Sequence, residues 1–434
     1  MKKLRGIPTI LGALVVLNLL TYFRTTVYKG GHPITWDFHL MKVDTFVYFA
    51  AGSRVNAGMK IYDTPILSGK GLAFDLLFTY PPFAAAVFSI LAPIIFPMVK
   101  ILIWQVGSFL AMYAVIMMVL RQRLGHLTPL AWVGGFLATA GTLALEPVQG
   151  LVFFGQINTF LMLLVCMDFL PKKRWPGIGV GLAAGLKLTP ALFGLIFLIQ
   201  RRWIAAITSF VTFLGTVVIG YWYVQDANDF WTRAMFDSNR VGPKVTPTSQ
   251  DINSILIRVF NVNGGPLLIL LDAIVLIFLV VAVYVAIRRK DPATAVVMTG
   301  IAACLVSPIS WYHHWVWVVP LLIMVLIDVN RRVISNKLAA PIALLVVVLY
   351  SIPWIAEPLA PHIYYEKLAS YGKLGALLFT FAGFATIAVY AIYGMVYDPL
   401  VRGEKAKKFP LDGLGIVDMA PTKAPEAATE AAVD

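Results

Sequence analysis

The sequence has little charge and almost no cysteine. Charged residues make up 13% of the chain, and its 2 cysteines, Cys166 and Cys304, both fall inside apolar runs. Two such cysteines do not indicate a disulfide framework. The sequence also lacks the CxxC and HExxH spacings of common zinc sites, and it has no glycine-rich loop of the kind that cradles nucleotide phosphates. These absences argue against a disulfide-stapled protein, a zinc enzyme and a nucleotide-dependent enzyme.

Apolar residues dominate the chain. They make up 59% of it, and the mean hydropathy is +0.80. Runs of about twenty apolar residues recur along most of its length, and each is long enough to cross a bilayer as a helix. Only helices and closed barrels satisfy their backbone in lipid, and these runs do not alternate as barrel strands do. We therefore expect an all-α, polytopic membrane protein with about twelve transmembrane helices.

Two long polar loops and a polar tail interrupt the apolar pattern. The predicted membrane domain covers residues 1–401, with a first outer loop at 24–79 and a second at 225–263. The tail at 402–434 is rich in Ala, Pro, Glu and Lys and has little to bury, so we expect it to be disordered. The predicted spans are 6–23, 80–97, 101–120, 130–147, 151–170, 176–199, 203–224, 266–287, 294–310, 315–329, 340–354 and 374–396.

The net charge of +13 comes from short basic clusters between the apolar runs, and such clusters set topology. Lys2, Lys3 and Arg5 predict a cytoplasmic N-terminus. The basic residues at 288–290 and 405–408 are then also inside, which predicts a cytoplasmic C-terminus. This arrangement places both long loops on the outer face of the plasma membrane.

The first half of the chain fits this rule less well. If every predicted span crosses the membrane once, which we call simple crossing, then Arg121, Arg123 and the basic residues at 172–174 lie outside. Either the rule is broken there, or some runs are paired half-helices that dip into the membrane and return. A glycine and a proline flank Lys187 in the run 176–199, which makes that run a candidate for such a break.

The first outer loop contains one carboxylate at the head of a short helical pattern. Asp44, Tyr48 and Gly52 are spaced i, i+4 and i+8, so they share one face of the predicted helix. An acid on a short helix at a membrane surface can reach a lipid-linked substrate. Asp is also a preferred N-cap residue, so the spacing alone leaves open whether Asp44 is catalytic or only caps the helix.

A central lysine in a membrane run is costly. Lys187 sits near the middle of its run, where insertion scales assign a lysine about 2.5–3.5 kcal/mol. It either anchors a phosphate or sugar in a polar cavity, or it snorkels or pairs with a buried acid.

Two outer segments hold further polar candidates. His313 and His314 lie among aromatic residues that are typical of a membrane interface; they either contact a phosphate or take up a proton, or are plain interfacial residues. Arg240, in the second outer loop, either clamps an anionic head group or is solvated. Ser249 or Asp251 is expected to cap the helix that follows.

Several short motifs follow one another along the chain. They are VDTFVYFAAG (43–52), IYD (61–63), FTYPPF (78–83), GQIN (155–158), GLAAGLKLTP (181–190), RRW (201–203), DSNRVG (237–242) and SPISWYHHWVW (307–317). This ordered set resembles glycosyltransferase family 87, the actinobacterial polyprenyl-phosphate-mannose-dependent α-1,2-mannosyltransferases with the GT-C membrane fold. One departure concerns the acceptor: where the family often has Asn-Gln-Ser-Leu-Asn-Gly, this chain has SQDINS (249–254).

The resemblance implies an inverting transfer of mannose from polyprenyl-phosphate-mannose to a hydroxyl of a mannosylated phosphatidylinositol or lipomannan acceptor. The expected partners are membrane lipids, this donor and the glycolipid acceptor, and not nucleic acid; no metal or cofactor is expected. The resemblance implies Asp44 as general base. The phosphate leaving group needs cationic or hydrogen-bonding partners, and the candidates are Lys187, Arg240, His313 and His314. The candidate acceptor or sugar contacts are Tyr48, Tyr80, Gln250 and Asn253.

Three other functions stay open at this point. The same fold could use polyprenyl-phosphate arabinofuranose. Many spans with intramembrane charges also suit a lipid or glycan transporter, although the sequence shows no internal repeat of the kind that many transporters have. A non-catalytic assembly protein would tolerate the loss of Asp44.

Overall fold

The structure is a computed structural model of the chain, and it describes residues 43–68, 75–93, 97–171, 175–242, 244, 249–330 and 378–397. These ranges are mostly helical, and within them the β structure amounts to isolated bridges. The predicted all-α membrane class is confirmed. The predicted spans at 6–23 and 340–354 and the predicted tail lie outside the described residues.

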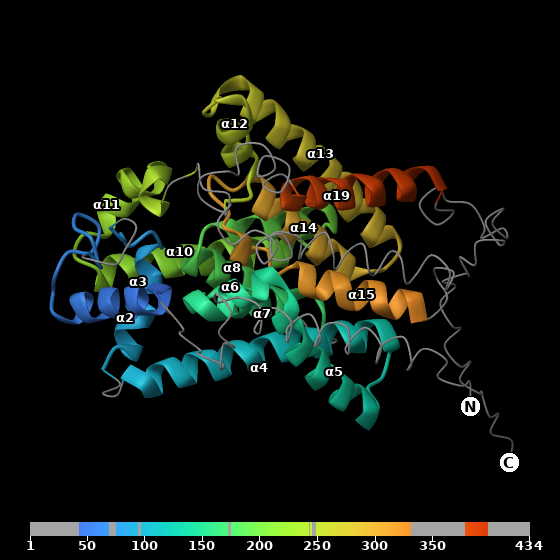
Figure 1. Ribbon diagram of the computed structural model, residues 1–434, viewed down its shortest axis with the longest axis horizontal. Coiled ribbons are helices and arrows are strands. Elements are labelled where there is room, and N and C mark those ends of the chain that lie inside the picture. The colour runs from blue at the N-terminus through green and yellow to red at the C-terminus, as the bar shows by residue number, and fades with distance from the viewer. Residues whose placement is uncertain are drawn as a thin grey trace, which may run out of the picture.

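The described helices begin at the left-hand end of the molecule, and the helix at 227–232 returns to that end (Figure 1). They are α2 (Val43–Asn56), α3 (Pro82–Leu91), α4 (Pro97–Leu124), α5 (Pro129–Gly141), α6 (Glu146–Phe154), α7 (Asn158–Phe169), α8 (Ile178–Leu186), α9 (Gly194–Ile199), α10 (Trp203–Tyr223), α11 (Ala227–Thr232), α12 (Ile252–Phe260), α13 (Gly265–Arg288), α14 (Pro292–Val306), α15 (Val318–Asn330) and α19 (Leu378–Tyr397), with 3-10 turns η1 (Thr142–Ala144), η2 (Thr189–Phe193), η3 (Ala234–Phe236), η4 (Ser238–Val241) and η5 (Tyr312–His314).

Four helices in the described part are long and apolar enough to cross a membrane. They are Val99–Leu124, Trp203–Tyr223, Gly265–Arg288 and Phe379–Val396, and α6 with α7 makes a fifth if this bent pair is one span. Shorter apolar helices, such as α14 and α15, pack among them. The count of about twelve spans stays a prediction.

The chain bends sharply at the GQIN motif, inside the predicted span 151–170. α6 ends before Gly155, whose φ of 70° lies in the left-handed region, and α7 begins at Asn158 after a bend of 117°. Glycine adopts this backbone conformation without steric cost. The Gly155 carbonyl accepts hydrogen bonds from the Thr45 hydroxyl (3.0 Å) and the Trp104 indole (2.8 Å). These side chains supply the partners that a buried carbonyl needs, and they tie α2 and α4 to the bend.

The predicted break in the run 176–199 is confirmed. α8 ends at Leu186, and Lys187 has an extended backbone (φ −154°, ψ 132°). The chain then continues as η2 and α9, with Pro190 near the start of η2. At this interruption the part-buried Lys187 side chain contacts Asn158 and His314.

A buried ion pair joins the end of α4 to the start of α14. Arg123 Nη2 lies 2.7 Å from Asp291 Oδ2, and each side chain is only 7% exposed. Asp291 also caps α14 by accepting from the Thr294 N–H. Arg123 therefore lies beside the basic turn at 288–290, which simple crossing had placed on the opposite side of the membrane. Simple crossing is wrong here, and the broken helices at residues 155 and 187 favour paired half-helices.

Replacing Asp291 with alanine is expected to cost about 3–5 kcal/mol of unfolding free energy, because it leaves Arg123 buried without its counterion. Thermal unfolding of the detergent-purified protein measures the change. The control is Asp229→Ala, whose carboxylate lies 3.9 Å from Arg233 at the surface and should contribute less than about 1 kcal/mol. Equal unfolding temperatures for the two variants would contradict this assignment.

α2 lies against α3 at one end of the molecule, and α3 packs on α10, which in turn packs on α8 (Figure 1). The contact between α2 and α3 is close because Gly52 meets the backbone at Phe88, where any side chain would collide. Pro82 starts α3, as the Pro-Pro sequence predicts. α6 packs against η5, the turn that contains the two histidines. These contacts bring α2, α6, α8 and η5 together around one pocket.

Candidate active site

A polar pocket of about 200 Å³ lies where the two outer loops meet the broken helices. One wall comes from α2, one from the segment before α3, and others from Gln156, the α8–η2 break and the segment 234–241. The segment before η5 completes it. Its polar and aromatic lining residues include Asp44, Tyr48, Tyr80, Gln156, Lys187, Asp237, Arg240, Trp311 and His314.

Asp44 faces this pocket from the first turn of α2. Its carboxylate oxygen Oδ2 accepts a hydrogen bond from the Gln156 amide. The carboxylate thus has a tertiary partner in addition to its favourable place near a helix N-terminus. The predicted face of α2 is confirmed for the two pocket residues, since Tyr48 lines the same pocket one turn further on.

The walls of the pocket change the acidity of Asp44. Desolvation raises the pKa of its carboxyl from 3.8 to about 6, while the Gln156 hydrogen bond and the charge of Lys187 act in the opposite direction. A carboxylate with a pKa near 6 is ionised at neutral pH and still accepts a proton readily. This combination suits a general base.

Gln156 connects most of the polar groups around Asp44. Its Nε2 also lies 3.1 Å from His313 Nε2, and its Oε1 is 3.4 Å from both the Tyr48 and Tyr80 hydroxyls. The two tyrosine hydroxyls are 2.8 Å apart. A neutral amide that donates to the base and accepts from tyrosines fixes the orientation of all three.

Lys187 points from the α8 break toward the same pocket. Its Nζ lies 3.3 Å from Asn158 Oδ1 and 3.3 Å from His314 Nε2, and it sits over the Tyr80 ring at 5.5 Å. These three groups are neutral, and they belong to the walls of the pocket. Of the alternatives for Lys187, the structure therefore favours an anchor in a polar cavity.

The structure separates the two histidines. His314 lines the pocket and contacts Lys187, whereas His313 is 4% exposed and lies behind Gln156 against the Phe154 ring. Desolvation, and then the charge of Lys187, hold the pKa of both imidazoles well below the usual value. Both are therefore neutral at pH 7, and His314 is placed to contact a ligand directly.

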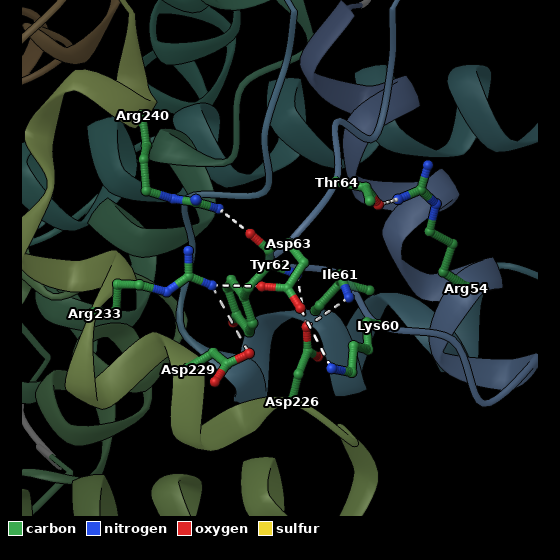
Figure 2. Close-up of polar contacts among 10 residues, drawn as sticks. All are labelled: Arg54, Lys60, Ile61, Tyr62, Asp63, Thr64, Asp226, Asp229, Arg233 and Arg240. Carbon is green, nitrogen blue, oxygen red and sulfur yellow. Dashed lines mark hydrogen bonds and ion pairs between the residues drawn. The ribbon is translucent and has the colours of Figure 1, made fainter.

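Arg240 lies on η4 of the second outer loop and lines the pocket. Figure 2 shows its guanidinium directed at the backbone of Tyr62. Its Nη2 donates to the Tyr62 carbonyl at 2.7 Å, which joins the second outer loop to the first. Its Nε has no partner in the described ranges. A guanidinium held by a backbone carbonyl through one nitrogen keeps other donors for an oxyanion.

The structure does not bring Gln250 and Asn253 to this pocket. The Gln250 N–H donates to the Ser310 carbonyl (2.6 Å), and the Asn253 side chain accepts from the Gly264 N–H (3.2 Å). Between them, Asp251 caps α12 and also accepts from the Ser310 N–H (2.9 Å), which confirms one of the two predicted caps. These residues hold the second outer loop against the segment that precedes the histidines.

The sequence presents Gln156 and Asn158 only within the GQIN motif and assigns neither of them a role of its own. Their place in a Gly-containing break within an apolar run is the signal that could have marked them as site residues. Trp311, which lines the pocket, was counted as part of an interfacial belt. Its role could not be separated from the other tryptophans by composition.

Replacing His314 with alanine is expected to raise the KM for a phosphate-bearing substrate about tenfold, since one hydrogen bond to a charged group is lost. Steady-state kinetics measure the effect. The matched variant is His313→Ala, which affects a residue behind the pocket and should change this KM less. Equal changes in both variants would contradict the separation of the two histidines.

The helices and the pocket together define a class, namely polytopic membrane proteins with a carboxylate and several cationic or polar groups facing one cavity. The model of glycosyltransferase family 87 matches residues 78–308, which is more than half of the chain. This chain belongs to glycosyltransferase family 87, so the predicted resemblance is confirmed. No solved structure matches the chain significantly.

Curated relatives cover most of the chain. A Mycobacterium tuberculosis polyprenol-phosphate-mannose-dependent alpha-(1-2)-phosphatidylinositol pentamannoside mannosyltransferase is 32% identical over 356 residues, which is 80% of each chain. The Mycolicibacterium smegmatis protein of the same description is 32% identical over 80% of this chain and 84% of its own length. A second Mycobacterium tuberculosis protein, described as a phosphatidylinositol mannoside mannosyltransferase, is 29% identical over 80% of this chain and 84% of its own.

Proposed function

We propose that this protein transfers mannose from polyprenyl-phosphate-mannose to a hydroxyl of a phosphatidylinositol mannoside or related lipomannan and forms an α-1,2 link with inversion. The observation that supports this best is the single pocket in which Asp44 faces Lys187, Arg240 and His314. One carboxylate can activate a hydroxyl there, and the cations and donors can hold a phosphate. The donor and acceptor follow the descriptions of the similar mannosyltransferases.

Asp44 takes the proton of the acceptor hydroxyl in this proposal. The acceptor oxygen attacks the anomeric carbon of mannose from the face opposite the phosphate. A new C–O bond forms as the bond between the anomeric carbon and the phosphate oxygen breaks. The electron pair of the broken bond stays on the phosphate, and the β-linked donor yields an α-linked product.

The leaving group is polyprenyl phosphate, which gains negative charge as the bond breaks. Lys187 and Arg240 supply positive charge, and His314 supplies a neutral polar contact. Groups that are held in place before the reaction stabilise such developing charge without reorganisation. Lys187 has the firmest support among them, since Asn158 and His314 both contact its ammonium group.

Tyr48 and Tyr80 line the pocket, and their hydroxyls are hydrogen-bonded to Gln156. They are assigned to the sugar ring or the acceptor hydroxyls. Gln250 and Asn253 support the loop, and their direct contact with the acceptor is not part of this proposal. No metal or other cofactor is expected, because the lipid-linked donor brings its own activated sugar.

The reaction is assigned to the outer face of the plasma membrane, with both termini in the cytoplasm. The basic clusters predict this orientation. The substitutions Asp229→Cys and Arg289→Cys, each made in a variant without Cys166 and Cys304, would test it with a membrane-impermeant maleimide. The Asp229→Cys variant should react in intact cells, and the Arg289→Cys variant only after permeabilisation. The opposite labelling pattern would overturn the orientation.

The decisive experiment incubates the purified protein in nanodiscs with labelled polyprenyl-phosphate-mannose and phosphatidylinositol mannosides of several lengths. We expect labelled product that an α-1,2-mannosidase cleaves. A parallel arm supplies polyprenyl-phosphate arabinofuranose, and another adds EDTA. Transfer of arabinofuranose alone, or no transfer with either donor, would overturn the proposal, and loss of activity with EDTA would overturn the metal-free mechanism.

A further inference from the structure

Residues 61–62 of the first outer loop are hydrogen-bonded to one buried carboxylate at the start of α11 (Figure 2). Asp226, directly before α11, accepts hydrogen bonds at Oδ2 from the Ile61 N–H (2.9 Å) and the Tyr62 N–H (2.8 Å). Asp226 is only 5% exposed. Two backbone N–H groups donate to the same carboxylate oxygen, so Asp226 fixes the position of this segment.

Tyr62 connects this segment to residues that line the pocket. Its side chain is fully buried, and its hydroxyl donates to the Tyr80 carbonyl at 2.8 Å. Its ring packs against Phe78 and Phe230, with centroids 5.9 and 5.4 Å away. The Tyr62 backbone therefore has little freedom, since the carboxylate of Asp226 holds its N–H and the pocket wall holds its ring.

The Tyr62 carbonyl then holds Arg240. It accepts from Arg240 Nη2 at 2.7 Å, and Arg240 lines the pocket that contains Asp44. η4, which carries Arg240, is a single turn in a polar loop, and Gly242 follows it directly. Such a short element does not by itself fix a long side chain, so the direction of the guanidinium depends on its contact with Tyr62.

We propose that Asp226 is a positioning residue for donor phosphate binding, which it supports through the Tyr62 carbonyl and the Arg240 guanidinium. This inference rests on the proposed function for the identity of the phosphate. Asp226 does not touch the substrate. It sets the register of the first outer loop, so that the carbonyl of Tyr62 presents Arg240 to the pocket.

A divalent cation is the other occupant to consider. Carboxylate oxygens of Asp63, Asp226 and Asp229 lie within 4.8 Å of one another. However, Arg233 forms an ion pair with Asp63 and lies 3.9 Å from Asp229, and Lys60 lies 3.4 Å from Asp63. These side chains already supply positive charge to Asp63 and Asp229. Asp226 Oδ2 is engaged by the two backbone N–H groups, and its Oδ1 has no hydrogen-bond partner among the described residues. Two of the three carboxylates are thus already neutralised, so the structure favours a structural contact between the two loops.

A double-mutant cycle tests the proposal with the purified full chain in nanodiscs and farnesyl phosphate as the probe. Asp226→Ala and Arg240→Gln should each weaken farnesyl phosphate binding about tenfold, and the double variant should bind no more weakly than Arg240→Gln. Asp226→Asn keeps an acceptor oxygen and should recover most of the affinity. In turnover, the KM for the donor should rise in Asp226→Ala while the KM for the acceptor is unchanged.

The control is Asp63→Asn, which removes the exposed ion pair with Arg233 one residue after Tyr62 and should change binding less than about twofold. Additive losses in the cycle, or normal binding by Asp226→Ala, would overturn the proposal. Stabilisation of the parent by Ca²⁺ or Mg²⁺ that disappears in Asp226→Ala would also overturn it, in favour of a cation site.

Hydrogen–deuterium exchange keeps this inference separate from the proposed function. Asp226→Ala should speed exchange at residues 61–63 and also at 238–242, without any ligand. If the parent neither binds farnesyl phosphate nor transfers mannose, the proposed function fails, and exchange still decides whether Asp226 orders the Arg240 segment. Unchanged exchange at 238–242 would overturn the positioning role.

Discussion

Replacing Asp44 with asparagine is expected to lower kcat by about 10²–10⁴-fold, the range that general base catalysis typically contributes. Asparagine keeps the shape and can still accept the Gln156 hydrogen bond, but it cannot take up the acceptor proton. Transfer of labelled mannose at saturating donor and acceptor measures the effect. Asp63→Asn changes an exposed carboxylate in the same outer loop and should keep kcat near that of the parent.

The pH dependence gives a second test of the same residue. Since desolvation raises the pKa of Asp44 to about 6, the base is protonated below that pH. The kcat/KM of the parent should therefore fall as the pH drops through about 6. The residual kcat/KM of Asp44→Asn should not show this decrease at low pH. An unchanged pH profile in the variant would assign the titration to another group.

Loss of activity in Asp44→Asn should not come from unfolding. The pKa of Asp44 is raised in the folded protein, so between pH 3.8 and about 6 the folded state binds more protons than the unfolded state, and stability falls as the pH rises. Above this range the ionised carboxylate costs on the order of 3 kcal/mol. An uncharged asparagine avoids this cost, and we expect an equal or higher unfolding temperature.

Replacing Lys187 with methionine is expected to lower kcat/KM by about 10²–10³-fold, as does the loss of one preorganised charge-stabilising group in other enzymes. Methionine keeps much of the apolar stem and removes the ammonium that lies beside Asn158 and His314. Initial rates at low donor concentration measure the change. Lys60→Met, at the surface of the first outer loop, is the control and should leave the rate unchanged.

Stability separates the two alternatives for Lys187. A lysine inside an apolar run costs about 2.5–3.5 kcal/mol on insertion scales, so Lys187→Met should not destabilise the protein if the lysine serves a ligand. A lower unfolding temperature with unchanged kcat/KM would show that Lys187 is a structural residue.

Local patterns in the sequence determined much of the framework. Composition predicted the helical membrane class, and the spacing of Asp44 and Tyr48 predicted one face of α2. Pro82 marked the start of α3, Asp251 was one of two predicted caps, and the residues around Lys187 predicted the break after α8. These features depend on neighbours within about one or two helical turns, and such short-range rules can be read from a single sequence.

The partners of the site residues were decided only by the tertiary structure. Gln156 meets Asp44 across 112 positions of sequence, and the pairing of Arg123 with Asp291 is of the same kind. The two histidines are adjacent in sequence, yet only His314 lines the pocket, because η5 turns His313 behind Gln156. No local period encodes such contacts, since they arise when broken helices fold back and bring distant polar side chains into one cavity.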